Sequence, residues 1–122
     1  MTDHSAFTTV ARVVRAASLS SSDLEASPLA ADQVVDGSPE VRSLALHSTN
    51  HLEVGVWQHS AGTTTDVESD EVFVVLAGRA TIEVEGGPTL EVGPGDLGML
   101  PAGAVTRWTV HETLRKVYVV RP

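Results

Sequence analysis

Apolar and polar residues alternate in short segments along most of this chain. The clearest case is 79–85, where Ala80, Ile82 and Val84 are separated by polar residues. Side chains of a β-strand point alternately to its two faces, so this segment places its apolar residues on one face. Such a pattern predicts an antiparallel strand with one face in the core and one in water.

Other short apolar segments are bounded by glycine, proline and polar residues. Residues 48–51 and 60–62 read as turns, residues 63–70 as a polar connector, and Ala77-Gly78 as a further turn. No segment has the length and period of a long helix. Many short strands with glycine and proline turns predict an all-β antiparallel sandwich or barrel. The expected strands are 41–47, 52–59, 72–76, 79–85, 89–92, 97–100, 105–110 and 114–120.

The first 27 residues lack this regularity. Residues 7–17 fit a strand or a short helix equally well, and the serine-rich 18–27 reads as a loop. We therefore expect an N-terminal segment over 1–27, either a strand exchanged in a dimer or a flexible arm. Residues 28–122 are then one domain, which is an ordinary size for a single core.

The composition of the chain limits the partners that it is expected to bind and the compartment in which it is expected to work. The 122 residues carry a formal net charge of −8, which disfavours binding to nucleic acid or to an anionic membrane. There is no cysteine, so disulfides, thiolate metal sites and cysteine nucleophiles are excluded. No apolar run is long enough to span a bilayer, and residues 1–18 do not resemble a signal peptide. We therefore expect a cytoplasmic protein.

Two blocks near the C-terminus carry a family resemblance. Residues 71–78 read EVFVVLAG, in which Glu71 is followed by six residues and Gly78. Residues 95–103 read GDLGMLPAG, with Gly95, Pro101 and Gly103 at fixed spacing. This ordered set resembles the two motifs of the cupin superfamily. The resemblance implies a single-domain antiparallel β-barrel of the double-stranded β-helix or jelly-roll type, and a homodimer.

The histidines of metal-binding cupins are missing from the matching positions. In the first motif they would fall at Thr64 and Asp66, or at Thr65 and Val67, and in the second at Thr106. Metals such as zinc, manganese and iron need three or four converging ligands. We therefore expect no cofactor, with a divalent metal as an alternative for which His59 and Glu71 are the weak candidates.

A narrower resemblance is to the cupin domain of ureidoglycine aminohydrolase. It rests on Gly55-Val56-Trp57, on Pro101-Ala102-Gly103 followed by Trp108, and on Arg115-Lys116. The likeness covers roughly residues 28–122. It implies a pocket inside the barrel, towards which the motif positions point.

Strand parity and the resemblance together give a candidate site. Glu71 is the candidate catalytic residue, since a carboxylate inside a barrel is costly unless it is paired or used. Its other reading is a rim carboxylate facing water, and Lys116 is a candidate ion-pair partner or a surface lysine. The expected ligand-binding residues are Trp57, Glu71, Phe73, Thr106, Trp108 and Lys116.

Three functions remain open. The first is a small-molecule-binding cupin without the usual metal site, whose aromatic faces and carboxylate suit an amine-like or ureide-like ligand. The second is a metal-dependent enzyme that resembles an aminohydrolase and acts on a ureido or amino compound. The third is a structural or regulatory module without catalysis.

Overall fold

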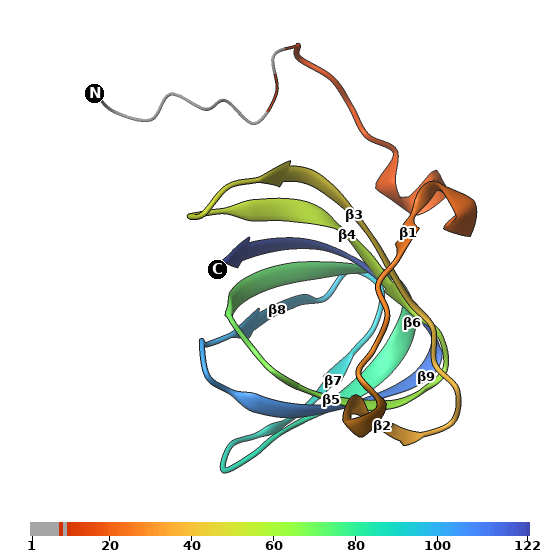
Figure 1. Ribbon diagram of the computed structural model, residues 1–122, viewed down its shortest axis with the longest axis vertical. Coiled ribbons are helices and arrows are strands. Elements are labelled where there is room, and N and C mark those ends of the chain that lie inside the picture. Colours follow the sequence, from red (N-terminus) through yellow and green to blue (C-terminus); the bar gives the residue numbers. More distant parts are fainter. Residues whose placement is uncertain (1–7, 9) are drawn as a thin grey trace.

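The computed structural model describes residues 8 and 10–122, which form an antiparallel β-barrel (Figure 1). Among these residues the longest helices are three-residue 3₁₀ turns, η1 (Ala16–Ser18), η2 (Ser21–Asp23) and η3 (Ala31–Gln33). The predicted all-β antiparallel barrel is therefore confirmed. The strands are β1 (Glu25–Ala26), β2 (Val34–Asp36), β3 (Val41–Ser48), β4 (Glu53–His59), β5 (Gly62–Val67), β6 (Asp70–Val84), β7 (Thr89–Val92), β8 (Leu97–Leu100) and β9 (Val105–Arg121).

Two long strands, β6 and β9, organise the barrel. They pair with each other from Asp70↔Arg121 to Val84↔Thr106, so each strand extends through both halves of the molecule. In one half, β8 flanks β6 and β4 flanks β9, with β3 and β1 beyond. In the other half, β7 flanks β6 and β5 flanks β9, with β2 beyond. The two halves face each other across the interior, as expected for a jelly roll.

Both long strands bend in the middle. The pairing register of β6 with β9 shifts between Val75 and Ala80, and Gly78 has a φ of 84°. A Cβ at Gly78 would collide with the backbone of Thr113, so this close approach needs glycine. The expected turn at Ala77-Gly78 and the expected break at 111–113 are therefore wrong. The chain bends there inside continuous strands.

The expected polar connector over 63–70 is also wrong. Residues Gly62–Val67 form β5, which pairs with β9 from Gly62↔Val110 to Val67↔Val105. Thr63 and Thr64 are buried although both are polar. The pattern of apolar residues missed this strand because its inward side chains are themselves polar.

The apolar run of β6 is divided between the two faces of the barrel. Phe73 and Val75 point inward and are each 1% exposed. Val72 lies on the outer face between Met99 and Val119, both of which are exposed. Inward residues of β6 and its neighbours make the core, a cluster of Phe73, Val75, Ala80, Ile82, Leu100, Trp108, Val110, Leu114 and Tyr118.

The described part of the N-terminal segment lies against the outside of the barrel. The guanidinium of Arg115 donates hydrogen bonds to the carbonyl oxygens of Ala16 and Leu19, and Leu24 is 2% exposed. The strand β1 pairs with β3, so the expected loop over 18–27 contains a short strand. Residues 1–7 and 9 lie outside the described residues, and the exchanged strand or flexible arm stays a prediction.

Candidate functional site

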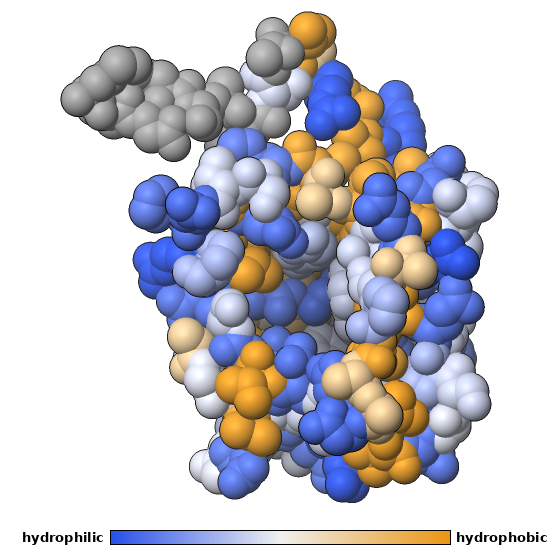
Figure 2. Space-filling view, viewed as in Figure 1, coloured by the Kyte–Doolittle hydropathy of each residue, from blue (hydrophilic) through white to orange (hydrophobic). Residues whose placement is uncertain are grey.

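A cavity of about 250 Å³ opens into the barrel. Figure 2 shows the hollow in the centre of one face, with hydrophilic residues inside it. We call the inward residues of β4 and β5 the polar wall and those of β6, β7 and β8 the apolar wall. The polar wall consists of Glu53, His59, Thr64 and Asp66, with Trp57 as its aromatic exception. The apolar wall consists of Phe73, Val75, Ala80, Ile82, Leu90, Val92 and Leu100, with Glu71 as its polar exception.

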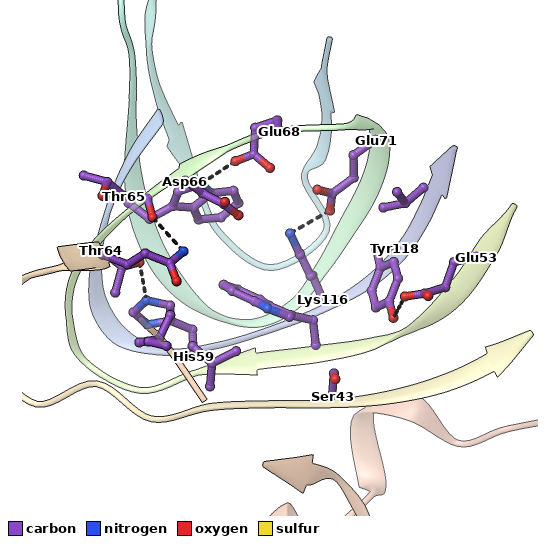
Figure 3. Close-up of a pocket in the computed structure, with 16 residues that line it drawn as sticks. Ser43, Glu53, His59, Thr64, Thr65, Asp66, Glu68, Glu71, Lys116 and Tyr118 are labelled. Atoms are coloured by element: carbon purple, nitrogen blue, oxygen red, sulfur yellow. Dashed lines mark hydrogen bonds and ion pairs between the residues drawn. The ribbon is translucent and has the colours of Figure 1, made fainter. Parts of the chain in front are cut away.

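The strand β9 lies between these walls and supplies the central side chain of the site. Lys116 is opposite Trp57 on β4 and opposite Val75 on β6. Its Nζ lies 2.6 Å from Oε2 of Glu71, and both side chains are buried (Figure 3). The partnership considered for Lys116 and Glu71 from the sequence is therefore present in the structure. Neither residue is a surface group, which was the alternative considered for each from the sequence.

Three aromatic rings surround the Lys116 ammonium. Nζ lies 4.3 Å from the ring centroid of Trp57, 4.7 Å from Phe73 and 4.6 Å from Trp108. Each distance is within the range of a cation–π contact, in which the negative face of a ring attracts a cation. We call these three rings the aromatic cage. It offsets part of the cost of burying the ammonium group.

Burial raises the pKa of the Glu71 carboxyl, and the neighbouring charge and hydrogen bonding of Lys116 oppose that rise. The carboxylates of Glu68 and Asp66 add to the rise. Apart from the ion pair, Oε2 of Glu71 has no hydrogen-bond partner among the described residues. This oxygen is shielded from solvent, so the Lys116 ammonium is the group that compensates its burial.

His59 is completely buried, and both its ring nitrogens are engaged. Nδ1 lies 2.6 Å from the carbonyl oxygen of Ser60, which can only accept, so Nδ1 carries the proton. Nε2 lies 2.9 Å from the hydroxyl of Thr64. Burial lowers the pKa of His59, and the charge of Lys116 adds to this, so the ring is neutral. Its Nε2 then accepts from Thr64, which leaves no free lone pair.

Glu68 connects two of the expected site residues. Its Oε2 accepts a hydrogen bond of 2.6 Å from the Thr106 hydroxyl and one of 3.1 Å from Trp108 Nε1. The neighbouring Asp66 has a pKa raised by burial and by the charge of Glu68. Thr106 thus orients an acidic side chain where a metal-binding cupin would place a histidine.

At the other end of the cavity, Tyr118 donates a hydrogen bond of 2.7 Å from its hydroxyl to Oε2 of Glu53. Burial and this bond raise the pKa of Tyr118, so its hydroxyl keeps the proton. A Cβ on Gly55, the cross-strand partner of Tyr118, would lie 2.6 Å from that hydroxyl. A larger residue at position 55 would collide with the Tyr118 hydroxyl, so glycine is needed there for the tyrosine to reach Glu53 across β4.

The structure brings most of the sequence-predicted residues together. Trp57, Glu71, Trp108 and Lys116 line the cavity. Phe73 lies behind Lys116 as part of the aromatic cage, and Thr106 is buried beneath Glu68. The functional candidates that sequence reasoning missed are Glu53, Glu68 and Tyr118. Glu53 lies on the same face of β4 as Trp57, and Tyr118 lies on the same face of β9 as Lys116. Strand parity could therefore have identified both from the sequence.

The residues present do not fit a divalent metal ion. The positions of the missing histidines hold Thr64 and Asp66, or Thr65 and Val67, in the first motif and Thr106 in the second. The hydroxyls of Thr64 and Thr106 bond to His59 and Glu68. A positively charged ammonium already lies against Glu71, the remaining motif ligand. Throughout the described part of the chain, no group of three His, Cys, Asp or Glu side chains could hold a metal. His59 and Glu71, the weak metal candidates from the sequence, belong to no such group, and a metal at these two residues stays a prediction.

Comparisons with known proteins agree with the fold. The model of the EutQ-like cupin domain family matches residues 47–118, which is more than half of the chain. No curated protein matches. In the residues that the structure describes, no helix has the length and apolarity needed to cross a membrane.

Solved structures with the same fold include proteins without a known function. One from Pseudomonas syringae pv. tomato str. DC3000 is 29% identical, with a TM-score of 0.69, and the match covers 80% of this chain and 43% of that one. The EutQ protein of Clostridium difficile is 24% identical, with a TM-score of 0.63, covering 75% and 76%. A Rhizobium leguminosarum protein of unknown function is 24% identical, with a TM-score of 0.61, covering 67% and 81%. The resemblance to ureidoglycine aminohydrolase is not confirmed by these matches and stays a prediction.

Proposed function

This chain belongs to the EutQ-like cupin domain family, and we propose that its barrel binds a small organic molecule without a tightly bound metal. The observation that carries the proposal is the buried Lys116–Glu71 pair at the wall of an open cavity of about 250 Å³. Convergent polar groups in a partly apolar cavity are typical of small-molecule sites. A cavity of this size suits a ligand of metabolite size rather than a polymer.

The balance of charge in the cavity indicates the ligand's chemistry. Four carboxylates, those of Glu53, Asp66, Glu68 and Glu71, line it together with one ammonium group. A ligand with N–H donors, such as an amine or a ureido compound, would pair with these oxygens. Trp57 and Trp108, whose rings already contact the Lys116 ammonium, line the same cavity and add apolar contact area for an N–H-rich ligand. The resemblance to ureidoglycine aminohydrolase supports the same ligand class.

A thermal-shift screen tests this proposal. A compound that binds the folded state alone raises the melting temperature by mass action. We expect stabilisation by amino or ureido compounds, and little by alcohols or simple carboxylates of equal size. The effect should disappear in Trp57→Ala and persist in Glu83→Gln, which changes an exposed residue of β6. If no amino or ureido compound stabilises the protein, or if Trp57→Ala responds like wild type, the proposal is wrong.

The other two functions make different predictions. A metal-dependent aminohydrolase would contain metal after purification, and stoichiometric manganese, zinc, iron or nickel would contradict the metal-free site. A purely structural module would have no ligand in the cavity, and an empty screen would favour it. A homodimer in the cytoplasm stays part of the proposal, and light scattering of the purified protein would test the dimer.

A further inference from the structure

The only lysine of the sequence is held from several sides inside the barrel. Lys116 is 4% exposed, although long charged side chains usually extend into water. Its Nζ lies 2.6 Å from Glu71 and between 4.3 and 4.7 Å from the three rings of the aromatic cage. A lysine has three N–H donors, and among the described residues Glu71 is the only carboxylate within ion-pair distance of it. These contacts fix the position of the ammonium group, but they do not use all three of its N–H donors.

The positive charge of Lys116 also acts on residues of the opposite wall. It opposes the rise in the pKa of Asp66 on β5 and adds to the lowering of the pKa of His59 on β4. Residues from β4, β5 and β6 therefore share the field of one cation. That cation lies beside Glu71, the carboxylate that the cupin motif assigns to a metal.

We infer that Lys116 is the resident cation of this barrel: its ammonium takes the place of a metal ion beside Glu71 and donates hydrogen bonds to a carboxylate or carbonyl oxygen of the bound molecule. The first part rests on the geometry of the aromatic cage and Glu71. The second part rests on the proposed function, and it adds an oxygen acceptor to the N–H groups expected of the ligand. The positive charge of the Lys116 ammonium repels a divalent cation from this place.

Chemical rescue tests the first part. Lys116→Ala removes a fragment of the shape of n-propylammonium, and n-propanol is its neutral counterpart. We expect Lys116→Ala to lose thermal stability and n-propylammonium chloride to restore much of that loss. An equal concentration of n-propanol with matched sodium chloride should restore less. Wild type and Arg107→Ala, which removes an exposed positive charge of β9, should not respond.

Two rescue outcomes would overturn the inference. Equal rescue by n-propanol would mean that the aromatic cage responds to volume alone. A folded Lys116→Ala variant that n-propylammonium does not stabilise would mean that the cage and Glu71 do not select a cation. If Lys116→Ala does not fold, the readout is the yield of folded protein after refolding with each compound. Recovery with n-propylammonium alone supports the inference, and recovery with both or with neither overturns it.

Metal and ligand titrations complete the test. Calorimetry with Zn²⁺ and Mn²⁺ should show no stoichiometric binding to wild type. A one-to-one complex that Glu71→Gln abolishes would overturn the inference and the metal-free part of the proposed function, but not the binding of a small organic molecule. The double variant Glu71→Gln/Lys116→Met should lose at least about tenfold in affinity for binders with a carboxylate or carbonyl oxygen. Unchanged affinity would refute the second part. If the screen finds no binder, the proposed function is refuted, but the first part of the inference, which the rescue tests, is not.

Discussion

The polar wall and the apolar wall are both formed by inward side chains of antiparallel strands, but these side chains differ in polarity. On the apolar wall, Phe73 and Ile82 are almost completely buried and contact other apolar residues of the core. On the polar wall, His59 and Thr64 are also buried, but they satisfy each other by a hydrogen bond of 2.9 Å. One wall is stabilised by burial of apolar area, and the other by satisfied polar groups.

The difference shows where this fold can change without losing its core. The apolar wall closes the interior and depends on volume, so its residues tolerate little change. The polar wall leaves a cavity, and its residues depend on partners that a ligand could supply or replace. Glu71 is the exception, because it is a polar residue on β6 and needs Lys116 from β9. Four experiments test this difference between the two walls, and the first has the largest expected effect.

Removing the cation should have the largest effect. Lys116→Met leaves Glu71 as an unpaired buried carboxylate, and breaking a buried pair in this way costs about 3–5 kcal/mol. The double variant Glu71→Gln/Lys116→Met carries neither charge and should recover part of that cost. Urea denaturation of both variants and of Glu71→Gln gives the coupling energy. Additive effects in this cycle would contradict the pair.

A cavity on the apolar wall should cost nearly as much. Ile82 is 0% exposed, and Ile82→Ala removes side-chain volume that the surrounding strands cannot fill, at a cost of about 2–5 kcal/mol. Urea denaturation measures it. Glu83→Ala, on the exposed face of the same strand, should change stability by less than about 0.5 kcal/mol. Similar losses in the two variants would mean that the apolar wall is not the core.

His59 should make stability depend on pH. Its pKa is lowered in the folded state from 6.5, so the unfolded chain binds the proton more readily. Stability is then lost as the pH falls below about 6.5, by at most about 1.4 kcal/mol per pH unit. Denaturation of wild type and His59→Gln between about pH 8 and pH 5 should show a steeper loss in wild type. An equal loss in His59→Gln would contradict this assignment.

Asp66 should have the smallest effect, and of opposite sign. Its pKa is raised from 3.8, so the folded state binds the proton more readily, and stability falls as the pH rises above about 3.8. Asp66→Asn should therefore stabilise the protein at neutral pH, by a few tenths of a kcal/mol because solvent screens this partly exposed group. The stabilisation should shrink towards acidic pH. Asp32→Asn, also exposed, is the control, and a destabilised Asp66→Asn would contradict the assignment.

The sequence predicted the fold where the two faces of a strand differ in polarity. Residues 79–85 alternate, and they lie in β6 with Ile82 buried. It failed for β5, whose inward residues Thr64 and Asp66 are polar because they face a cavity. It also failed at Gly78, because a glycine that permits a bend inside a strand looks the same as one that ends it.

The candidate site was predictable in part. Motif spacing selected Glu71, and strand parity together with the resemblance put Trp57 and Lys116 in one candidate site. The structure places these two residues next to each other. The role of Glu68 was not predictable, because it follows the end of β5 and reaches Thr106 only through the folded loop. Parity alone also could not show that Phe73 lies behind Lys116 rather than at the cavity surface.

The position of β9 has a consequence for how the chain folds during synthesis. β9 is made after β1 to β8, yet it pairs with β4, β5 and β6 and joins the two halves of the barrel (Figure 1). While the nascent chain still lacks residues 105–121, the edges of β4 and β5 have no partner on that side. Such unpaired edges are sites of misassembly. The barrel can therefore close only after β9 has left the ribosome, and its folding depends on contacts between residues distant in sequence.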